Sequence, residues 1–186
     1  SVAVTEEGDV LAWGYGGVGR LGLSDTRHRW LPAQISADCF GWCGENRRRR
    51  VVMVAAGKAH TAAVSDDGSL FTWGCGIDGR LGLGDRSNRS SPHRVKVGTP
   101  VRMVSCGNLH TLAVTEDGRL FSWGDGNDNR LGHGKSAGLV LFPVRVMGKI
   151  STAKVVSASA GFSHSLALTH DGVLFGWGRG CGLVDG

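Results

Sequence analysis

The chain has 186 residues, which is enough for one or two domains with a sizeable core. Charged residues make up 20% and hydrophobic residues 41%, a balance that excludes a largely disordered chain. The formal net charge of +5 allows an acidic partner without requiring nucleic acid. No apolar run approaches the roughly 20 residues of a membrane span, so no membrane partner is expected.

The five cysteines do not pair evenly, which favours a reducing compartment and therefore a nuclear or cytoplasmic location. Cys39 and Cys43 form a C-x3-C pair. No second pair follows at zinc-site spacing and no histidine lies close behind, so neither a metal nor another cofactor is expected.

Glycine is unusually frequent, with 31 residues, and it follows a repeated unit. One copy occupies residues 1–22 without its front end, and three further copies begin at Gly57, Gly107 and Gly161. The units share a Trp-Gly pair whose tryptophans, at positions 13, 73, 123 and 177, recur at intervals of 60, 50 and 54 residues. A period near 50 is typical of propeller blades, whereas two-helix repeats are nearer 33–34 residues.

Each unit predicts a β-hairpin. In the second copy His60–Ser65 alternates, Asp66–Gly68 is an Asp-Gly turn, and Ser69–Trp73 is a second alternating run. The two-residue period places Phe71 and Trp73 on one face of that run.

Two further strands are expected between successive hairpins. One begins at a proline, as in 92–97, with Pro32 and Pro143 in the matching places. The other runs into the next repeat glycine, at 51–56, 101–106 and 154–159. Proline fits the first residue of a strand or an edge strand. Four strands per repeat predict an all-β chain, a β-propeller of four-stranded blades.

These units resemble the regulator of chromosome condensation family, whose repeats form a seven-bladed β-propeller. The resemblance rests on Gly-x-x-His-Thr/Ser, the Asp-Gly turn, Trp-Gly, and Gly-Arg-Leu-Gly at 19–22 and 79–82, with Asn129 replacing the first of those glycines in the third unit. It implies a partial propeller of about three and a half blades.

The expected organisation is a single partial propeller over 1–186. Residues 1–35 form an incomplete first repeat with its following strand, 36–50 a long basic and aromatic loop, and 51–82, 92–132 and 143–182 further repeats. An unclosed propeller presents unpaired strand edges. We therefore expect either a piece of a longer chain or self-association through open blade edges.

Several repeated residues are candidate functional groups. Arg20, Arg80 and Arg130 recur in the Leu-Gly loop, where they either bond to loop carbonyls or form an arc facing an acidic partner. The repeated histidines and turn aspartates are expected to be structural, because a catalytic triad would not be copied into each blade. The G-x-G-x-x-G matches at 14–19 and 74–79 lack the following helix that a dinucleotide site needs.

The connection over 36–50 is the part that does not repeat, and it is some ten residues longer than the others. It combines Phe40 and Trp42 with four consecutive arginines, Arg47, Arg48, Arg49 and Arg50. Loops on a rigid scaffold often bind partners, and Trp and Arg are enriched at interaction hot spots. A solvated loop is the alternative, and a nuclear-localisation role for the arginines is not separable from these.

The resemblance implies a non-enzymatic interaction module whose loops bind an acidic protein, a nucleosome or a small GTPase. The founding member is an exchange factor for a Ran-type small GTPase, and that activity is the alternative function. Its exchange wedge extends a Trp-Gly loop, and no such insertion follows the tryptophans at 13, 73, 123 and 177. The family's photoreceptor carries Trp in the Gly-x-x-His loops; here those positions hold Lys58-Ala59, Asn108-Leu109 and Phe162-Ser163, so a photoreceptor is not expected.

Overall fold

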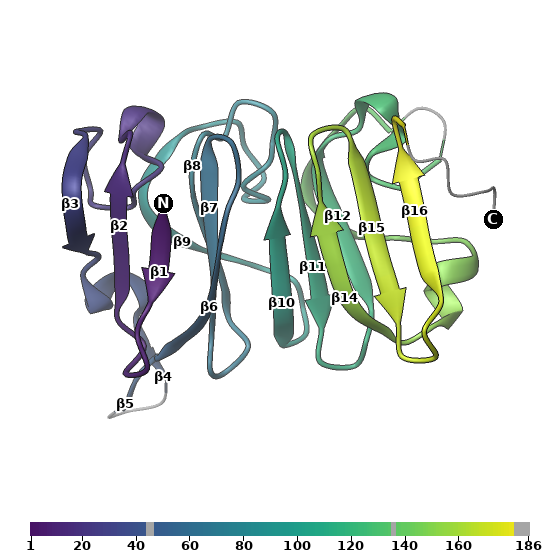
Figure 1. The fold of residues 1–186 in the computed structure, drawn as a ribbon, viewed down its shortest axis with the longest axis horizontal. Coiled ribbons are helices and arrows are strands. Elements are labelled where there is room, and N and C mark those ends of the chain that lie inside the picture. Colours follow the sequence, from purple (N-terminus) through teal and green to yellow (C-terminus); the bar gives the residue numbers. More distant parts are fainter. Residues whose placement is uncertain (44–46, 135–136, 181–186) are drawn as a thin grey trace.

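The computed structural model describes residues 1–43, 47–134 and 137–180. In that part the chain forms four larger antiparallel sheets that stand side by side in chain order, as Figure 1 shows, and one small two-stranded sheet. The predicted all-β propeller fold is confirmed. Helical structure in the described residues is limited to short 3-10 turns, and none of their helices is long and apolar enough to cross a bilayer.

The first and last sheets have three strands each, and the two inner sheets have four. The first contains β1 (Val2–Val4), β2 (Val10–Gly14) and β3 (Arg29–Gln34); the second β6 (Val51–Ala56), β7 (His60–Ser65), β8 (Leu70–Gly74) and β9 (Arg89–Val95); the third β10 (Val101–Cys106), β11 (His110–Thr115), β12 (Leu120–Asp125) and β13 (Leu139–Arg145); the fourth β14 (Val155–Ala160), β15 (His164–Thr169) and β16 (Leu174–Gly178). We call these sheets blades 1 to 4.

Smaller elements lie in the connections between strands. They are the ribbon β4 (Trp42–Cys43) with β5 (Arg47–Arg48) and the 3-10 turns η1 (Gly17–Gly19), η2 (Ala37–Phe40), η3 (Asn127–Asn129) and η4 (Lys149–Thr152). The ribbon and η2 follow blade 1 and precede β6.

The proline-containing strands complete the sheet of the hairpin before them. The prediction that this strand starts at its proline is wrong: β9 starts at Arg89, so Pro92 lies within it. A register irregularity between Thr72 and Gly74 lets the start of β9 pair with the end of β8. Pro92 is tolerated because β9 is the edge strand of its sheet, which frees one side from backbone pairing.

The core lies between the blades as three apolar layers. Trp73 packs between blades 1 and 2 with Val10 and Ala12, and Trp123 packs between blades 2 and 3 with Ala62 and Val64. Both indoles have no exposed surface. The alanines let the sheets approach closely enough for one large ring to fill each layer.

The tryptophans also connect successive blades by hydrogen bonds. Nε1 of Trp73 donates to the carbonyl of Arg20 (3.1 Å), and Nε1 of Trp123 donates to the carbonyl of Arg80 (2.9 Å). Trp177 makes the same bond to Arg130 (2.9 Å). A Cβ on Gly82, where φ is +69°, would lie 2.6 Å from Nε1 of Trp123. The last glycine of Gly-Arg-Leu-Gly therefore packs directly against the tryptophan of the next blade, where a side chain would not fit.

Candidate functional site

The repeated histidines join neighbouring blades. Nε2 of His60 lies 2.8 Å from Oγ1 of Thr111, and Nε2 of His110 lies 2.9 Å from Oγ of Ser165. Burial, helped by the positive charge of a nearby arginine, lowers the pKa of His60 to about 3 and that of His110 to about 4. Both rings are therefore neutral at ordinary pH, and they serve packing between blades.

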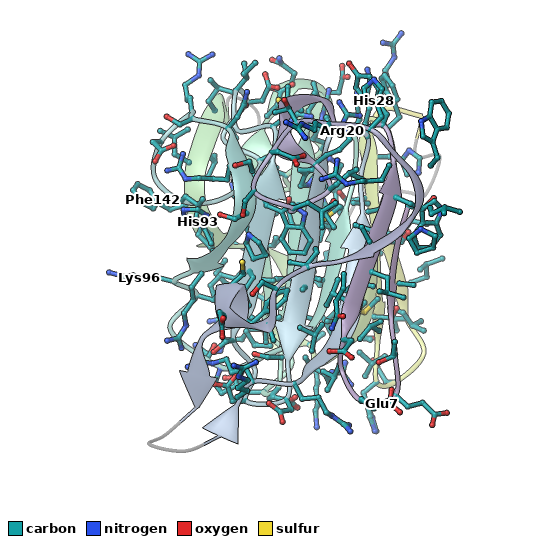
Figure 2. All side chains as sticks on the ribbon, turned by 90° about the vertical axis from the view of Figure 1, so that its left-hand side faces the viewer. Glu7, Arg20, His28, His93, Lys96 and Phe142 are labelled. Atoms are coloured by element: carbon teal, nitrogen blue, oxygen red, sulfur yellow. The ribbon has the colours of Figure 1, made fainter. Side chains whose placement is uncertain are left out.

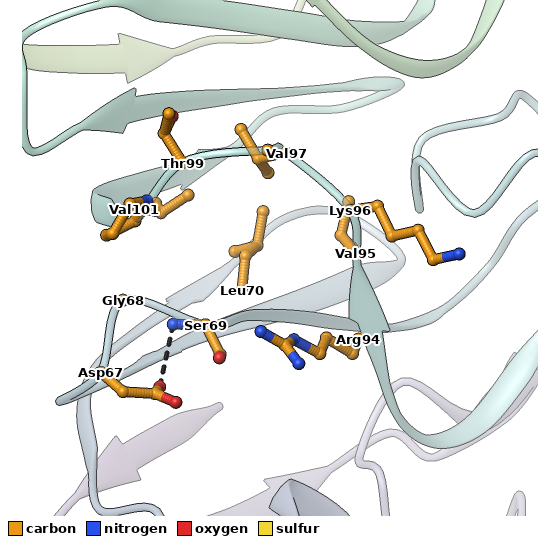
Figure 3. Close-up of a pocket in the computed structure, with 12 residues that line it drawn as sticks. Asp67, Gly68, Ser69, Leu70, Arg94, Val95, Lys96, Val97, Thr99 and Val101 are labelled. Carbon is orange, nitrogen blue, oxygen red and sulfur yellow. Dashed lines mark hydrogen bonds between the residues drawn. The ribbon is translucent and has the colours of Figure 1, made fainter. Parts of the chain in front are cut away.

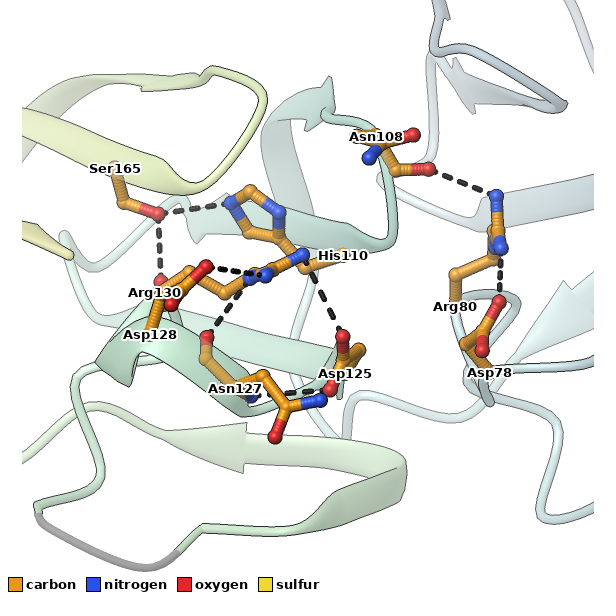
Figure 4. A network of polar contacts seen from close by, with 9 residues as sticks. All are labelled: Asp78, Arg80, Asn108, His110, Asp125, Asn127, Asp128, Arg130 and Ser165. Atoms are coloured by element: carbon orange, nitrogen blue, oxygen red, sulfur yellow. Dashed lines mark hydrogen bonds and ion pairs between the residues drawn. The ribbon is translucent and has the colours of Figure 1, made fainter. Parts of the chain in front are cut away.

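Two of the three repeated arginines are buried (Figure 4). Arg80 donates from Nη1 to the carbonyl of Asn108 (2.8 Å) and forms an ion pair with Asp78. Arg130 pairs with Asp128 (3.0 Å) and lies 3.5 Å from a carboxylate oxygen of Asp125. Each arginine is 4% exposed. Their guanidinium groups thus hold loops within and between blades, and a partner has no access to them.

Arg20 differs from the other two because Val18 stands where they have an aspartate. Its Nε donates to the carbonyl of Gly17 (3.0 Å) and its Nη1 to the carbonyl of Lys58 (2.7 Å). Its guanidinium carbon lies 4.8 Å from the ring centroid of Tyr15. Within the described residues no carboxylate forms an ion pair with Arg20, which is half-buried.

Phe40 is a core residue. It is 3% exposed, and its ring meets those of Phe71 and Trp73 edge-on, with centroids 5.3 and 6.3 Å apart. This ring fixes the long connection to the layer between blades 1 and 2. A partner cannot reach it in this fold.

The arginine run that follows splits into different roles. Arg49 donates from Nε to Oδ2 of Asp67 (2.8 Å) and from Nη1 to the carbonyl of Phe40 (3.1 Å), so it braces the connection. Arg48 and Arg50 are exposed; Arg48 lies 3.2 Å from Asp38, and Arg50 donates to the carbonyl of Glu6 (3.1 Å).

Trp42 lies in β4 and Arg47 in β5. The structure describes the backbone of these two residues and not their side chains. The ribbon that they form projects from the lower end of the blades in Figure 1.

The predicted binding residues do not form one site. In Figure 2 Arg20 lies at one end of the blades, together with His28, whereas Glu7 and the ribbon lie at the opposite end. A groove at the ribbon end is lined by Glu7, Asp9 and Asp66 together with Arg48, Arg49 and Arg50. The structure thus presents two separate candidate surfaces, which we call the Arg20 rim (Tyr15, Arg20, His28 and Lys58) and the basic connection (residues 36–50).

A further pocket of about 540 Å³ lies where the β7–β8 turn meets the β9–β10 connection (Figure 3). Asp67 and Ser69 line one side, and Leu70, Val97 and Val101 line the apolar part. Burial opposes ionisation of Asp67, but hydrogen bonds from Ser65 and Arg49 outweigh it and hold the pKa of Asp67 well below its usual range. Asp67 is therefore already bound by its own chain.

The G-x-G-x-x-G matches fold as turns between strands, and the first contains the 3-10 turn η1. A Cβ on Gly16 would lie 1.8 Å from the carbonyl oxygen of Arg27, so glycine is required by this close approach. Among the described residues no group of three or more His, Cys, Asp or Glu is placed to hold a metal ion.

The sequence alone gave no sign of Tyr15, and it indicated His28 only as part of the basic and aromatic stretch 27–30 before Pro32. Their rings lie 4.6 Å apart, and Tyr15 is 61% exposed. The signal that could have found them is a difference between repeats, since Tyr15 stands where the next repeats have Cys75 and Asp125.

The sequence matches the repeat of the Regulator of chromosome condensation (RCC1) family at residues 7–64, 67–114 and 117–168, and a second form of that repeat at 51–80, 101–130 and 155–182. It is 42% identical to the ultraviolet-B receptor UVR8 of Arabidopsis thaliana over 95% of the chain and 38% of the receptor. It is 39% identical to the human E3 ubiquitin-protein ligase HERC2, over 96% of the chain and 4% of that ligase. The chain therefore spans well under half the length of these relatives.

Solved structures show the same architecture. Human WBSCR16 superposes with a TM-score of 0.81 and 25% identity. The match covers the whole of this chain and 47% of WBSCR16. Yeast RCC1 (Prp20), in its complex with Kap60, covers 96% of the chain and 41% of its own length with a TM-score of 0.77 and 28% identity. With three matched repeats and this shared fold, the chain belongs to the regulator of chromosome condensation (RCC1) repeat family.

Proposed function

We propose that the chain is a non-enzymatic interaction module that binds an acidic protein surface through loops at the ends of its blades. The net charge of +5 supports an acidic partner. The stacked blades supply the rigid scaffold on which binding loops commonly occur.

The observation that carries this proposal is how the basic connection is held. Phe40 is buried against Phe71, and Arg49 is tied to Asp67, so the connection is fixed at two points. Between and beside these anchors Arg48 and Arg50 remain exposed. Two cations are therefore presented on preorganised backbone, which reduces the entropy lost on binding.

The ion pair between Arg48 and Asp38 does not prevent Arg48 from binding a partner. The side chains of Arg48 and Asp38 are 55% and 70% exposed, and an ion pair this exposed is worth about 0–1 kcal/mol. A partner carboxylate with better geometry can replace Asp38. Arginine suits this exchange because its planar fork bonds both oxygens of a carboxylate.

The test uses a double variant, Arg48→Ala with Arg50→Ala, in the 186-residue chain. Intact nucleosomes and small GTPases are titrated onto it at several salt concentrations. We expect the variant to bind its acidic partner about tenfold more weakly, with a flatter dependence on salt.

The matched control is Arg94→Ala with Lys96→Ala, which removes two exposed cations from another surface. Arg49 is left intact because it braces the fold. Equal binding by the Arg48/Arg50 variant and the parent would remove the basic connection as the site.

The second candidate is guanine nucleotide exchange on a Ran-type small GTPase, which family membership favours. It ranks below the binding module because the described loops after Trp13, Trp73 and Trp123 hold no inserted strand. Faster release of labelled GDP on addition of the chain would support it, and an unchanged rate across several GTPases would count against it.

A further inference from the structure

We infer that the Arg20 rim is a second binding site, specific for the carboxylates of an acidic, Asp- and Glu-rich peptide segment of a partner protein. This inference rests on the proposed binding function and adds a site at the opposite end of the blades. The three Arg-Leu-Gly loops of this chain differ in the acidic residues that surround their arginines.

The loops neutralise their arginines in two of three cases. Arg80 has Asp78 two residues before it, and Arg130 has Asp128 in the same place with Asp125 close by. The corresponding residues before Arg20 are Val18 and Tyr15, so neither acid is present. Arg20 therefore carries a positive charge that the described part of the fold leaves uncompensated.

An aromatic contact takes the place of the missing carboxylate. The centroid of the Tyr15 ring lies 4.8 Å from the guanidinium carbon of Arg20, and 4.6 Å from the centroid of the His28 ring, which is tilted against it by 35°. A Cβ on Gly17 would lie 2.5 Å from Cε1 of Tyr15, so this folded-back ring needs the glycine that the other loops replace with Ile77 and Asn127. Three positions of one loop thus differ together from the other repeats.

The residue type at position 18 is also unusual for its backbone conformation. Val18 has φ +58°, a left-handed conformation that costs a β-branched residue more than an aspartate or asparagine. Asp128 adopts φ +57° at the equivalent position. The first loop therefore keeps an unfavourable residue at the point where an aspartate would both fit better and neutralise Arg20. Strain of this kind is found where a site has a use.

The donors available on the rim suit a carboxylate. Nδ1 of His28 accepts a hydrogen bond from the backbone N–H of Gly16 (3.1 Å), which leaves Nε2 of the ring as the donor. The Tyr15 hydroxyl and the guanidinium of Arg20 supply further donors, and Lys58 adds a second cation whose Nζ lies 5.7 Å from the Phe162 ring. Tyr15 and Phe162 are 61% and 67% exposed, so an extended peptide can reach both.

Anions other than carboxylates would meet the same charge, so the experiment has to separate them. The geometry favours protein over nucleic acid because the described cations of the rim are few and interleaved with exposed aromatic rings. This composition is typical of protein–protein hot spots. Binding of duplex DNA through a charged track would need many more phosphate contacts.

The test installs the missing acid. Val18→Asp recreates the Arg–Asp pair of the other loops, and Val18→Asn is its matched control, since asparagine tolerates the same backbone without adding charge. Binding of a fluorescein-labelled Glu-rich peptide to the 186-residue chain is measured by anisotropy. We expect Val18→Asp to weaken binding about tenfold and Val18→Asn to leave it unchanged.

Thermal unfolding shows whether the fold survives, and both variants should melt no lower than the parent because the strained valine is gone. Equal binding by Val18→Asp and Val18→Asn overturns the inference, as does equal binding of a Gln-rich control peptide. So does loss of binding to a duplex DNA fragment, rather than to the peptide, in Val18→Asp.

The Arg48→Ala/Arg50→Ala variant is measured in the same assay, so that the two sites can be told apart. If only that variant loses the acidic peptide, the basic connection is the site and the inference about the Arg20 rim fails. If only Val18→Asp loses it, the rim is the site for this ligand. If the parent binds no acidic peptide, both assignments fail for this ligand class.

Discussion

The ion pair between Arg49 and Asp67 shows that one arginine of the basic run has a structural role. The two side chains are 14% and 19% exposed and meet at 2.8 Å, while Oγ of Ser65 and the backbone of Ser69 donate to the other carboxylate oxygen of Asp67. Asp67 therefore remains ionised in the folded chain. The pair links the long connection to the β7–β8 turn of blade 2.

We expect Arg49→Ala to lower the free energy of unfolding by about 1–3 kcal/mol, because it leaves Asp67 partly buried without its cation. Urea denaturation at neutral pH measures this, with Arg94→Ala as the exposed-arginine control. If both variants unfold at the same urea concentration as the parent, Arg49 does not brace the connection.

The three repeated arginines show that the role of a residue cannot be predicted from its repetition in the sequence alone. The repetition of Arg20, Arg80 and Arg130 could be read from the sequence, but the burial of Arg80 and Arg130 could not, because it depends on their aspartates and on the blade that follows. A contact that recurs between blades requires a repeated residue, so repetition by itself does not indicate a binding site. The residue that distinguishes Arg20 from the other two arginines is Val18, which stands where they have an aspartate.

At the scale of elements, the hairpins were predictable because their signals are local. Period-two alternation and an Asp-Gly turn identified β7 to within its observed bounds, and the run into the next repeat glycine did so for β6 and β10. The start of β9 was missed because it depends on an irregular register against β8, which no local pattern encodes.

The connection between blades 1 and 2 was harder to predict for a different reason. Phe40 ends the 3-10 turn η2, and Ile150 lies in η4 in the connection between blades 3 and 4. Both side chains are buried, so each connection adds one residue to the apolar layer between the two blades that it joins. An aromatic residue among polar and basic neighbours gives no sign of this, because the layer it fills is made by two other elements.

Neutral histidines between blades make the stability of the chain depend on pH. His60 and His110 have folded-state pKa values of about 3 and about 4, below the ordinary 6.5, so the unfolded chain binds protons more readily. Their contribution is complete above pH 6.5 and is lost as the pH falls from there towards 3 to 4.

We expect the free energy of unfolding to fall by about 2 kcal/mol for each of these histidines between pH 7 and pH 5. Urea denaturation at both pH values measures the fall. The double variant His60→Gln with His110→Gln should lose most of it, while His93→Gln, on an exposed residue, should keep it. An unchanged fall in the double variant would contradict this coupling.

At the scale of the whole molecule, both outer blades expose apolar side chains, and those of blade 4 are of the kind that is buried between inner blades. Blade 1 presents Trp30 and Leu31, which are 92% and 77% exposed. Blade 4 presents Leu168 and Leu174, 38% and 50% exposed, whereas Leu70 of blade 2 is 1% exposed. Surfaces shaped to receive a blade favour association of copies head to tail.

We expect the 186-residue chain to show a solution mass that rises with concentration above 19.6 kDa, measured by gel filtration with light scattering. Leu168→Asp with Leu174→Asp should shift it to the monomer, because charges oppose burial of that face. Leu139→Asp, on an edge strand within the stack, is the control. A parent that is monomeric at all concentrations would contradict self-association.

The tryptophan-to-carbonyl bond has an evolutionary consequence. It runs in one direction at all three junctions, from the indole of one blade to the loop of the blade before it. This bond therefore does not depend on which blade comes before, and duplication or deletion of one whole unit in the gene would leave it matched at every remaining junction. A partial unit would break that match. Lineages can thus lengthen or shorten such arrays in whole steps, while each surface loop diverges independently toward its own partner.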